Sequence, residues 1–312
     1  ALSSAASDVY KRQFQYRPKN TDTWMDVATT VNTVASSASA TLTGLTSTTA
    51  YEYRLTDGEI SVATGEFTTA AEIALQNGSL DGWDGSSPNA ATDSKFWDTS
   101  NEGAKMGGLT PTQAVTDFVH TQGGKAAKLE SGKVDLMGGI FAAASLYTGS
   151  FGSTNIWTQT ATVNFGQSFT ARPIALKGFY KYTPNVINLV KNVPAGVTIV
   201  KDQTLDQCAI YIALAKKTYT IDNGNQSTFI DFKNDENIIA YGELPSGAAT
   251  EGDGYVEFNI PLKYKNLTDQ PTHIIVVCSS SKYGDYMTGG AGSTLYVDDL
   301  SLIYDGTPTI WE

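Results

Sequence analysis

The chain is poor in the side chains that soft metals and thiol chemistry require. Only two histidines and two cysteines occur among its 312 residues. Zinc sites and reactive thiol sites need such groups close together, so the sequence argues against both. Cys208 and Cys278 lie in apolar segments far apart in the chain. Two alternatives stay open for them: two buried thiols, or one disulfide between neighbouring strands.

Positive charge and long apolar runs are also scarce. The chain has 21 Lys and Arg against 32 Asp and Glu, which gives a net charge of −11. This charge argues against nucleic acid and anionic membrane as partners. No apolar run approaches the roughly 18 residues of a membrane-spanning helix, and no apolar signal region opens the sequence. We therefore expect no transmembrane segment and no export signal left in this sequence.

Helix signals are few, and strand signals fill the chain. Apolar residues alternate in short runs that Gly, Asn, Asp or Pro interrupt, which is typical of an all-β protein. The length suits two domains with sizeable cores. We expect one sandwich over residues 1–72 and a larger one over residues 73–312.

The segment "LTGLTSTTAYEYRL" (42–55) resembles the fibronectin type III pattern, in which a leucine-bearing turn precedes a corner tyrosine. The resemblance implies an immunoglobulin-like or fibronectin III-like sandwich over residues 1–72. Tyr51 or Tyr53 would be the corner tyrosine, with its hydroxyl bonded to backbone a few residues upstream. We expect this domain to serve as a spacer.

The segment "STLYVDDLSLIYDG" (293–306) places two aspartates inside an apolar alternation. In a regular strand Asp298 shares a face with Leu300 and Leu302, whereas Asp299 points outward. A carboxylate that faces a core is costly unless it is paired. The sequence therefore predicts a partner for Asp298.

Two loops and one strand combine aromatic rings with polar side chains, as sugar-binding sites do. They are "KFWDTSNEG" (95–103), "SSSKYGDYMTGG" (279–290) and "GFYKYTP" (178–184). A structural role stays open for two of these segments. Trp97 would then be a plug within its loop, and the aromatic strand at 178–184 would only fill the core and cover the surface. The candidate ligand-binding residues are Trp97, Asp98, Asn101, Lys181, Lys282, Tyr283 and Asp285.

Hydrolysis of a glycosidic bond needs two carboxyl groups, one of them with a raised pKa. If the two loops converge, the candidate catalytic residues are Asp98, Glu102 and Asp285. No Ser-His-Asp arrangement is visible, because His120 and His273 lie in segments without obvious partners. We expect His273, at the start of a strand, to be structural.

Seven motifs occur in order between about residues 75 and 305. They are "NGSLDGW", "FWDTSN", "GGKAAKLES", "LYTGSF", "FTARPIALKGFYKYTP", "YVEFNIPLKY" and "PTHIIVVCSSSKYGDYMTGGAGSTLYVDDLSLIY". With these motifs the chain resembles the putative carbohydrate-metabolism domain (PCMD) family of exported bacterial proteins. The resemblance implies a jelly-roll β-sandwich similar to carbohydrate-binding modules, placed behind an immunoglobulin-like domain. It also implies an exported protein of the periplasm or cell surface, with a lipid anchor before processing as one variant, and other cell-envelope glycan-utilisation proteins as partners.

Carbohydrate-binding jelly rolls of this kind hold a structural calcium between their first and last strands. Here "NGSLD" (77–81) stands in the place of the first strand. The resemblance implies Asp81 and Asp298 as carboxylate ligands and Asn77 as a third ligand, which suits a cation that takes six to eight oxygens. The alternative is that Asp298 bonds to backbone amides or to a lysine. No organic cofactor is expected.

Three functions stay open at this point. The first is non-catalytic binding of an oligo- or polysaccharide, with Trp97, Tyr283 and Asp285 in one cleft. The second is glycoside hydrolysis by a carboxylate pair, and the third is a structural or adhesive role in the cell envelope. We favour the first, because acidic residues are common in β-protein loops without catalysis.

Overall fold

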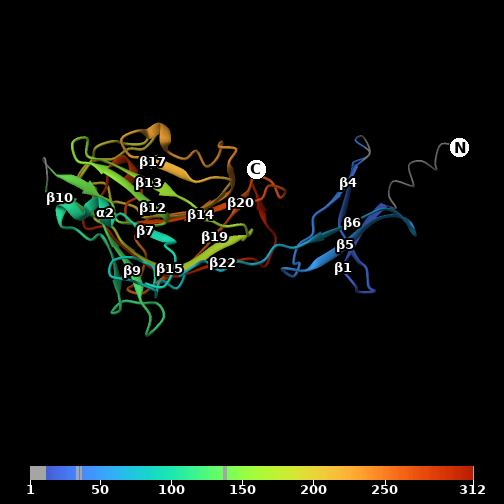
Figure 1. Ribbon diagram of the computed structural model, residues 1–312. Helices are drawn as coiled ribbons and strands as arrows, with labels where there is room; N and C mark the ends of the chain where they lie inside the picture. Colours follow the sequence, from blue (N-terminus) through green and yellow to red (C-terminus); the bar gives the residue numbers. More distant parts are fainter. Residues whose placement is uncertain (1–11, 33–34, 36, 136–138, 312) are drawn as a thin grey trace. The chain divides into compact units, whose positions relative to one another are not determined.

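The computed structural model describes residues 12–32, 35, 37–135 and 139–311. The chain divides into two compact units. The first ends at Glu72 and takes in Asp305–Thr307, and the second comprises Ile73–Tyr304 and the chain from Pro308. Strands dominate both units (Figure 1), which confirms the all-β prediction. That residues 1–72 fold independently of the rest stays a prediction.

The first unit contains an antiparallel sheet and a separate hairpin. The sheet runs in the order β2 (Met25–Val27), β1 (Arg12–Pro18), β5 (Ala50–Asp57) and β6 (Ile60–Thr68), and the hairpin pairs β3 (Thr29–Asn32) with β4 (Ser37–Ala40). Tyr51 is buried, and its hydroxyl accepts a hydrogen bond from the backbone N–H of Thr46 at 3.0 Å. Tyr51, rather than Tyr53, therefore makes the bond expected of a corner tyrosine. The fibronectin III-like assignment itself stays a prediction.

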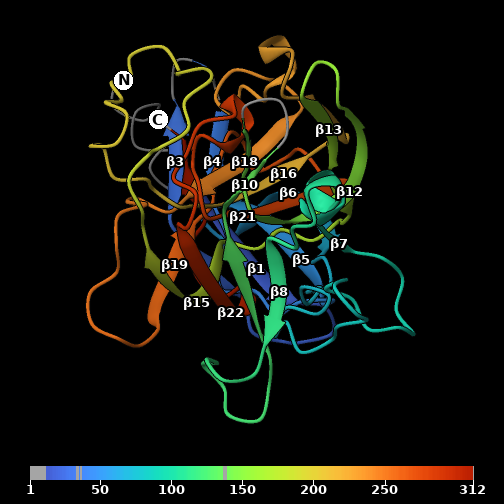
Figure 2. The ribbon, with the colours of Figure 1, turned by 90° about the vertical axis from the view of Figure 1, so that its left-hand side faces the viewer.

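The second unit is a β-sandwich, whose two sheets form separate layers in Figure 2. The larger sheet runs in the order β17 (Tyr219–Asp222), β13 (Thr160–Phe165), β12 (Ser145–Asn155), β21 (His273–Ser279), β16 (Ala209–Ala215), β18 (Ile238–Glu243), β20 (Lys263–Tyr264) and β23 (Thr309–Ile310). Two short strands join it at the side, β7 (Trp97–Thr99) on β12 and β14 (Gln167–Ser168) on β21. The smaller sheet runs in the order β19 (Val256–Pro261), β15 (Ala175–Thr183), β22 (Thr294–Ile303), β9 (Ala126–Glu130) and β8 (Thr112–Val115).

Short elements frame one end of the larger sheet. They are the hairpin of β10 (Gly132–Val134) and β11 (Ile140–Ala142), helix α2 (Asn101–Ala104), and the 3-10 turns η2 (Lys105–Gly107), η3 (Gln226–Thr228) and η4 (Gly284–Tyr286). Within the ranges described above, no helix combines the length and apolarity needed to cross a bilayer.

The main core lies between the two sheets. Alternate residues of β16 and β21, such as Ile212 and Val276, face Leu176 and Leu295 of the smaller sheet. Burying one such side chain stabilises the fold by about 1.5–3 kcal/mol. Cys208 and Cys278 belong to the same core, where both are free thiols, so the first of the two cysteine alternatives holds.

Strand β22 carries a β-bulge at its two aspartates, and the bulge corrects the predicted orientation of Asp298. The register of β22 against β15 shifts just after Asp298, and Asp299 has a left-handed φ of 50°. An extra residue reverses the face that the following side chains take. Val297 and Leu300 therefore both pack into the core, whereas Asp298 lies on the outer face opposite Phe179. Strict alternation, which allows no extra residue, placed Asp298 on the wrong face.

The connection from β8 to β9 covers this outer face and buries Asp298. The two carboxylate oxygens of Asp298 accept the backbone N–H groups of His120 at 2.7 Å and of Asp299 at 2.8 Å. The His120 ring stacks on Phe179 with the ring centroids 3.4 Å apart. Its Nδ1 lies 2.7 Å from Oδ2 of Asp299. The partner of Asp298 is therefore the backbone of the covering loop and of its own strand.

The outer face of the larger sheet carries a second apolar cluster, which includes Phe165, Ala213 and Ile275. One cross-strand row in it spans three neighbouring strands. Tyr147 on β12 is paired with Val277 on β21, which is paired in turn with Tyr211 on β16. Directly opposed residues share a face of the sheet, so these three side chains form a continuous floor.

Candidate functional site

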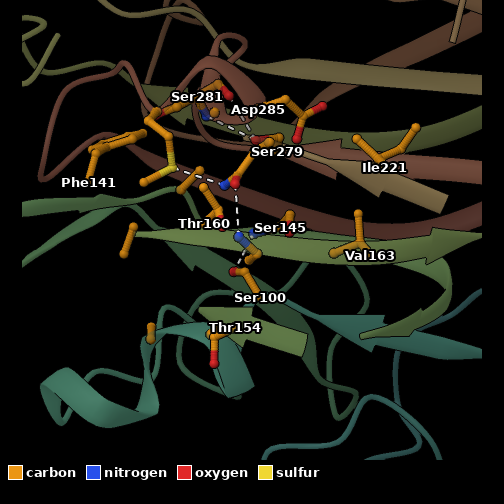
Figure 3. A pocket seen from close by; sticks show the side chains of 18 of the residues that line it. Ser100, Phe141, Ser145, Thr154, Thr160, Val163, Ile221, Ser279, Ser281 and Asp285 are labelled. Carbon is orange, nitrogen blue, oxygen red and sulfur yellow. Dashed lines mark hydrogen bonds between the residues drawn. The ribbon is translucent and has the colours of Figure 1, made fainter. Parts of the chain in front are cut away.

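A pocket of about 200 Å³ lies over the floor formed by Tyr147, Val277 and Tyr211 (Figure 3). Its walls come from α2 and η2, the β10–β11 hairpin, the β12–β13 hairpin and η4. Apolar side chains prevail, and the larger ones besides the floor include Met106, Phe141, Phe151, Ile156, Phe165 and Met287. Apolar and aromatic walls with a few polar groups are typical of small-molecule sites.

Asp285 on η4 is the acidic residue of this pocket. In the described part of the chain it is the one carboxylate among the lining residues, and no hydrogen bond or ion pair engages it. Its side chain is exposed, and the surrounding protein nevertheless raises the pKa of Asp285 to about 6 by desolvation. Both observations fit a carboxylate that is open to solvent on one side and surrounded by the pocket walls on the other. Lys282, also exposed, lines the pocket beside it.

Local backbone geometry fixes the position of Asp285. A Cβ added at Gly284 would lie 2.6 Å from Cβ of Ala143 on the β11–β12 connection. Any side chain there would push η4 away from the pocket wall. The turn ends at Met287, whose φ of 56° is left-handed and whose N–H donates to the carbonyl of Gly284 at 2.8 Å. The glycine therefore allows the close approach that brings Asp285 into the pocket.

Trp157 lies at the tip of the β12–β13 hairpin with 81% of its surface exposed. Its neighbours Ile156 and Gln159 line the pocket, so Trp157 belongs to the hairpin that forms one pocket wall. The side-chain carbonyl of Asn155 accepts the backbone N–H groups of Trp157 and Thr158, at 3.0 and 3.2 Å. These hydrogen bonds define an asparagine turn at the tip of the hairpin. An exposed indole is the kind of group that stacks on a sugar ring.

Trp97 has the opposite environment, and this corrects its predicted role. It is fully buried in the core, and its indole N–H donates to the carbonyl of Gln76 at 2.7 Å. An inaccessible ring offers no face to a ligand. Of the two alternatives given for Trp97, the structure therefore supports the loop plug.

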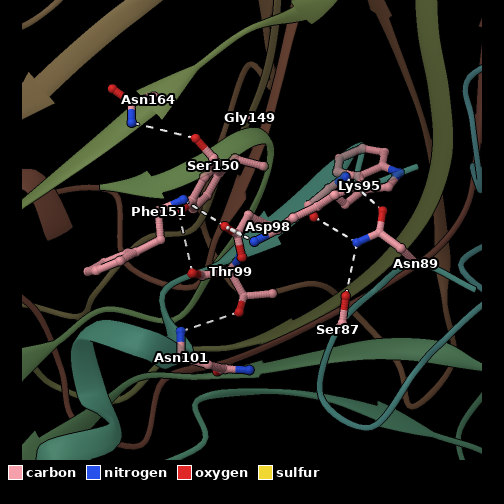
Figure 4. A network of polar contacts seen from close by, with 12 residues as sticks. Ser87, Asn89, Lys95, Asp98, Thr99, Asn101, Gly149, Ser150, Phe151 and Asn164 are labelled. Atoms are coloured by element: carbon pink, nitrogen blue, oxygen red, sulfur yellow. Dashed lines mark hydrogen bonds and ion pairs between the residues drawn. The ribbon is translucent and has the colours of Figure 1, made fainter. Parts of the chain in front are cut away.

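Asp98 and Asn101 belong to the same structural network (Figure 4). Asp98 accepts the backbone N–H groups of Thr99 and Phe151 and pairs with Lys95 at 2.7 Å. Asn101 exchanges two hydrogen bonds of 2.8 Å with the backbone of Thr112. Their polar groups are thus occupied in holding β7 and the start of α2, and neither residue lines the pocket.

The remaining candidates are dispersed. Lys181 lies on the outer face of the smaller sheet, where its ammonium group donates to the carbonyls of Thr250 and Gly252. Glu102 pairs with Lys105 at 3.4 Å on the solvent side of α2. Tyr283 is half-buried, and burial raises its pKa, but it does not line the pocket. The prediction that Trp97, Tyr283 and Asp285 share one cleft is therefore wrong. Of the three, only Asp285 lines the pocket.

The two predicted loops nevertheless do meet. Ser100 and Gly103 from the first line the same pocket as Lys282 and Asp285 from the second. Sequence reasoning thus found the two segments and two of the polar lining residues, Lys282 and Asp285. It missed Trp157 and Tyr211. The signal for Trp157 was available in "TNIWTQT", a tryptophan in a polar turn between two alternating strands.

The residues expected to hold calcium each accept hydrogen bonds from backbone N–H groups. The side-chain oxygen of Asn77 accepts the backbone N–H of Gly82 at 2.9 Å, and one oxygen of Asp81 accepts that of Lys125 at 2.7 Å. Both oxygens of Asp298 are likewise taken by backbone N–H groups. Among the described residues no group of three or more acidic, histidine or cysteine side chains could hold a metal ion. Calcium at this place stays a prediction, for which these hydrogen bonds offer an alternative.

Two solved structures are similar to this chain in fold. One is described as a putative glycoside hydrolase from Bacteroides thetaiotaomicron VPI-5482, with 22% identity and a TM-score of 0.57 over 82% of this chain and 79% of that chain. The other, a putative glycoside hydrolase from Bacteroides vulgatus ATCC 8482, has 25% identity and a TM-score of 0.51 over 69% of this chain and 88% of that chain. No curated protein matches the chain.

A family model matches residues 61–303, from within β6 of the first unit to the end of β22. The match covers most of the sequence and nearly the whole sandwich that carries the pocket. Its description is "Putative carbohydrate metabolism domain". The expected resemblance is therefore confirmed, and this chain belongs to the PCMD family.

Proposed function

We propose that this chain binds a glycan, without cleaving it, in the pocket on the outer face of the larger sheet. The observation that carries the proposal is the exposed indole of Trp157 on a hairpin that forms one wall of a pocket, which is also lined by an unpaired carboxylate, Asp285. A sugar ring has flat C–H faces and a rim of hydroxyl groups. The indole can stack on a C–H face, and the carboxylate and Lys282 can form hydrogen bonds with the hydroxyl groups.

Glycoside hydrolysis is the second candidate, and one observation favours it. The pKa of Asp285, raised by desolvation to about 6, is that of a carboxyl group able to donate a proton near neutral pH. Hydrolysis needs a second carboxyl group within about 10 Å. The pocket lining in the described residues supplies none, and Asp98 is already held by two backbone N–H groups and Lys95. Binding is therefore the better-supported function.

A glycan array probed with the whole chain tests the proposal. We expect binding to a restricted set of glycans, and we expect Trp157→Ala and Asp285→Asn to abolish or weaken it. Chromatography of each bound glycan after long incubation should return it intact. Binding that both variants leave unchanged would refute the pocket as the site, and shortened products that disappear in Asp285→Asn would establish the hydrolase instead.

Export to the periplasm or cell surface, and cooperation with other glycan-utilisation proteins of the cell envelope, stay parts of this proposal. They rest on the resemblance to exported family members rather than on any feature of the pocket.

A further inference from the structure

The pocket is more apolar than a ligand made only of hydroxyl groups would need. Besides Trp157, two other large apolar side chains at its mouth are exposed, Met106 at 57% and Ile156 at 41%. Phe141, which is buried, and Phe151, which is half-buried, also line the pocket. Hydroxyl groups pressed against such walls lose water without gaining hydrogen bonds, which is costly. The walls therefore favour a ligand that carries an apolar substituent into the pocket.

Two polar groups of complementary character lie among these walls. Asp285 offers carboxylate oxygens, which accept hydrogen bonds, and no described residue donates to them. Tyr211 offers a hydroxyl group that makes no hydrogen bond within the described chain. Asp285 and Tyr211 line the same pocket. Burial first, and then the charge of Asp285, raises the pKa of Tyr211. The hydroxyl is therefore kept protonated and able to donate.

A substituent that satisfies all of these features must donate one hydrogen bond, accept another and expose a methyl group. A hydroxyl group lacks the methyl group, an ammonium group accepts nothing, and a carboxylate is repelled by Asp285. An acetamido group has all three parts in one plane, since its amide donates through N–H and accepts through C=O. We propose that the pocket recognises sugars that carry an acetamido group, with Asp285 accepting its N–H, Tyr211 donating to its carbonyl and the apolar walls holding its methyl group. This inference rests on the glycan binding proposed above.

Three sugars that differ only at carbon 2 test the inference. The probes are the methyl glycosides of glucose, glucosamine and N-acetylglucosamine, together with the matching galactose series, titrated by NMR against the whole chain at about pH 7.5. In at least one series we expect the acetamido sugar to bind about tenfold tighter than both of its relatives, because each of them lacks either the methyl group or one hydrogen bond. Asp285→Asn and Tyr211→Phe should each remove most of this preference. Asp253→Asn, an exposed carboxylate on another loop, should leave it unchanged.

Failure of the acetamido inference can be distinguished from failure of the proposed glycan binding. Equal or tighter binding of the hydroxyl sugars would overturn the acetamido inference while glycan binding stands. Tightest binding of the amino sugars would mean that Asp285 recognises an ammonium group, which also overturns it. Binding of array glycans that all lack acetamido groups would do the same. Only an array without any bound glycan would overturn the proposed function as well.

Discussion

Two tryptophans in similar sequence settings have opposite environments in this protein. Trp97 in "KFWDTSN" and Trp157 in "TNIWTQT" both follow an apolar residue and both precede polar ones. Trp97 is fully buried in β7, which pairs with β12, whereas Trp157 is 81% exposed at the end of the β12–β13 hairpin. The difference comes from what surrounds each loop. Asn89 and β12 enclose Trp97, whereas Asn155 turns Trp157 out of the sheet.

The comparison teaches that an aromatic ring in a polar loop indicates a ligand site only when the ring is outside the core. Trp97 stabilises the sandwich, and Trp157 is available for a partner. Substitutions at Trp97 should therefore change the stability of the fold, whereas substitutions at Trp157 should change glycan binding.

The largest expected effect is on stability. Trp97→Ala should lower the free energy of unfolding by about 3–5 kcal/mol, because it removes a buried ring and leaves a cavity. Trp157→Ala should change it by no more than about 0.5 kcal/mol, as exposed substitutions usually do. Urea titrations of both variants give the two values. Equal losses in the two variants would contradict the contrast between the segments.

The next effect is on affinity. Trp157→Ala should weaken binding of an array-positive glycan by about 1–3 kcal/mol, or roughly tenfold or more, if the indole is a central anchor. Calorimetric titration measures the change, and the unaltered urea midpoint of the same variant serves as its control. An affinity within twofold of the parent chain would remove Trp157 from the site.

The charged carboxylate of Asp285 should destabilise the folded chain near neutral pH, although it contributes to glycan binding. Its pKa in the folded chain is about 6, above the roughly 3.9 of an unfolded aspartate. Between these values the folded state binds more protons than the unfolded state, so stability falls as pH rises through this window. Asp285→Asn should therefore melt at a higher temperature than the parent chain at about pH 7.5, with the difference vanishing below about pH 4. A variant less stable than the parent at about pH 7.5 would contradict this account of the pocket.

A smaller effect is expected at the other sheet. Asp298→Asn should lower the free energy of unfolding by about 1–3 kcal/mol. An amide has only one acceptor oxygen, so its NH₂ group would face the backbone N–H of either His120 or Asp299. Melts in millimolar calcium and in a chelator should coincide if these hydrogen bonds alone hold the carboxylate. A calcium-dependent rise of several degrees that Asp298→Asn erases would instead establish the calcium site that the resemblance implies.

The smallest effect is expected from the first unit. Deletion of residues 1–72 should leave glycan affinity unchanged, because every residue that lines the pocket belongs to the second unit. Calorimetric titration of the shortened chain, after circular dichroism has shown it to be folded, makes the measurement. A folded deletion variant that no longer binds would show that the first unit takes part in recognition.

Alternation and turn residues in the sequence were enough to predict an all-β protein and the meeting of the segments around residues 100 and 285. They were not enough for β22. The bulge at Asp298 and Asp299 depends on the covering loop around His120, which donates to one carboxylate and contacts the other. A contact between segments so distant in the chain leaves no local signal, so strict alternation gave the wrong face for Asp298.

The pocket was only half predictable for a related reason. Asp285 and Lys282 lie in a loop whose composition suits a ligand site, and composition is local. Tyr211 is an ordinary strand residue until pairing with Val277 brings it beside Tyr147. Its role depends on the strand order of the sheet, which no single segment encodes.

The most direct test is a crystal structure of the chain with the tightest-binding oligosaccharide from the array. The account predicts a sugar over the row of Tyr147, Val277 and Tyr211, with one ring against the indole of Trp157 and one substituent at hydrogen-bonding distance from Asp285. A sugar bound elsewhere on the sandwich, with this pocket empty, would contradict it.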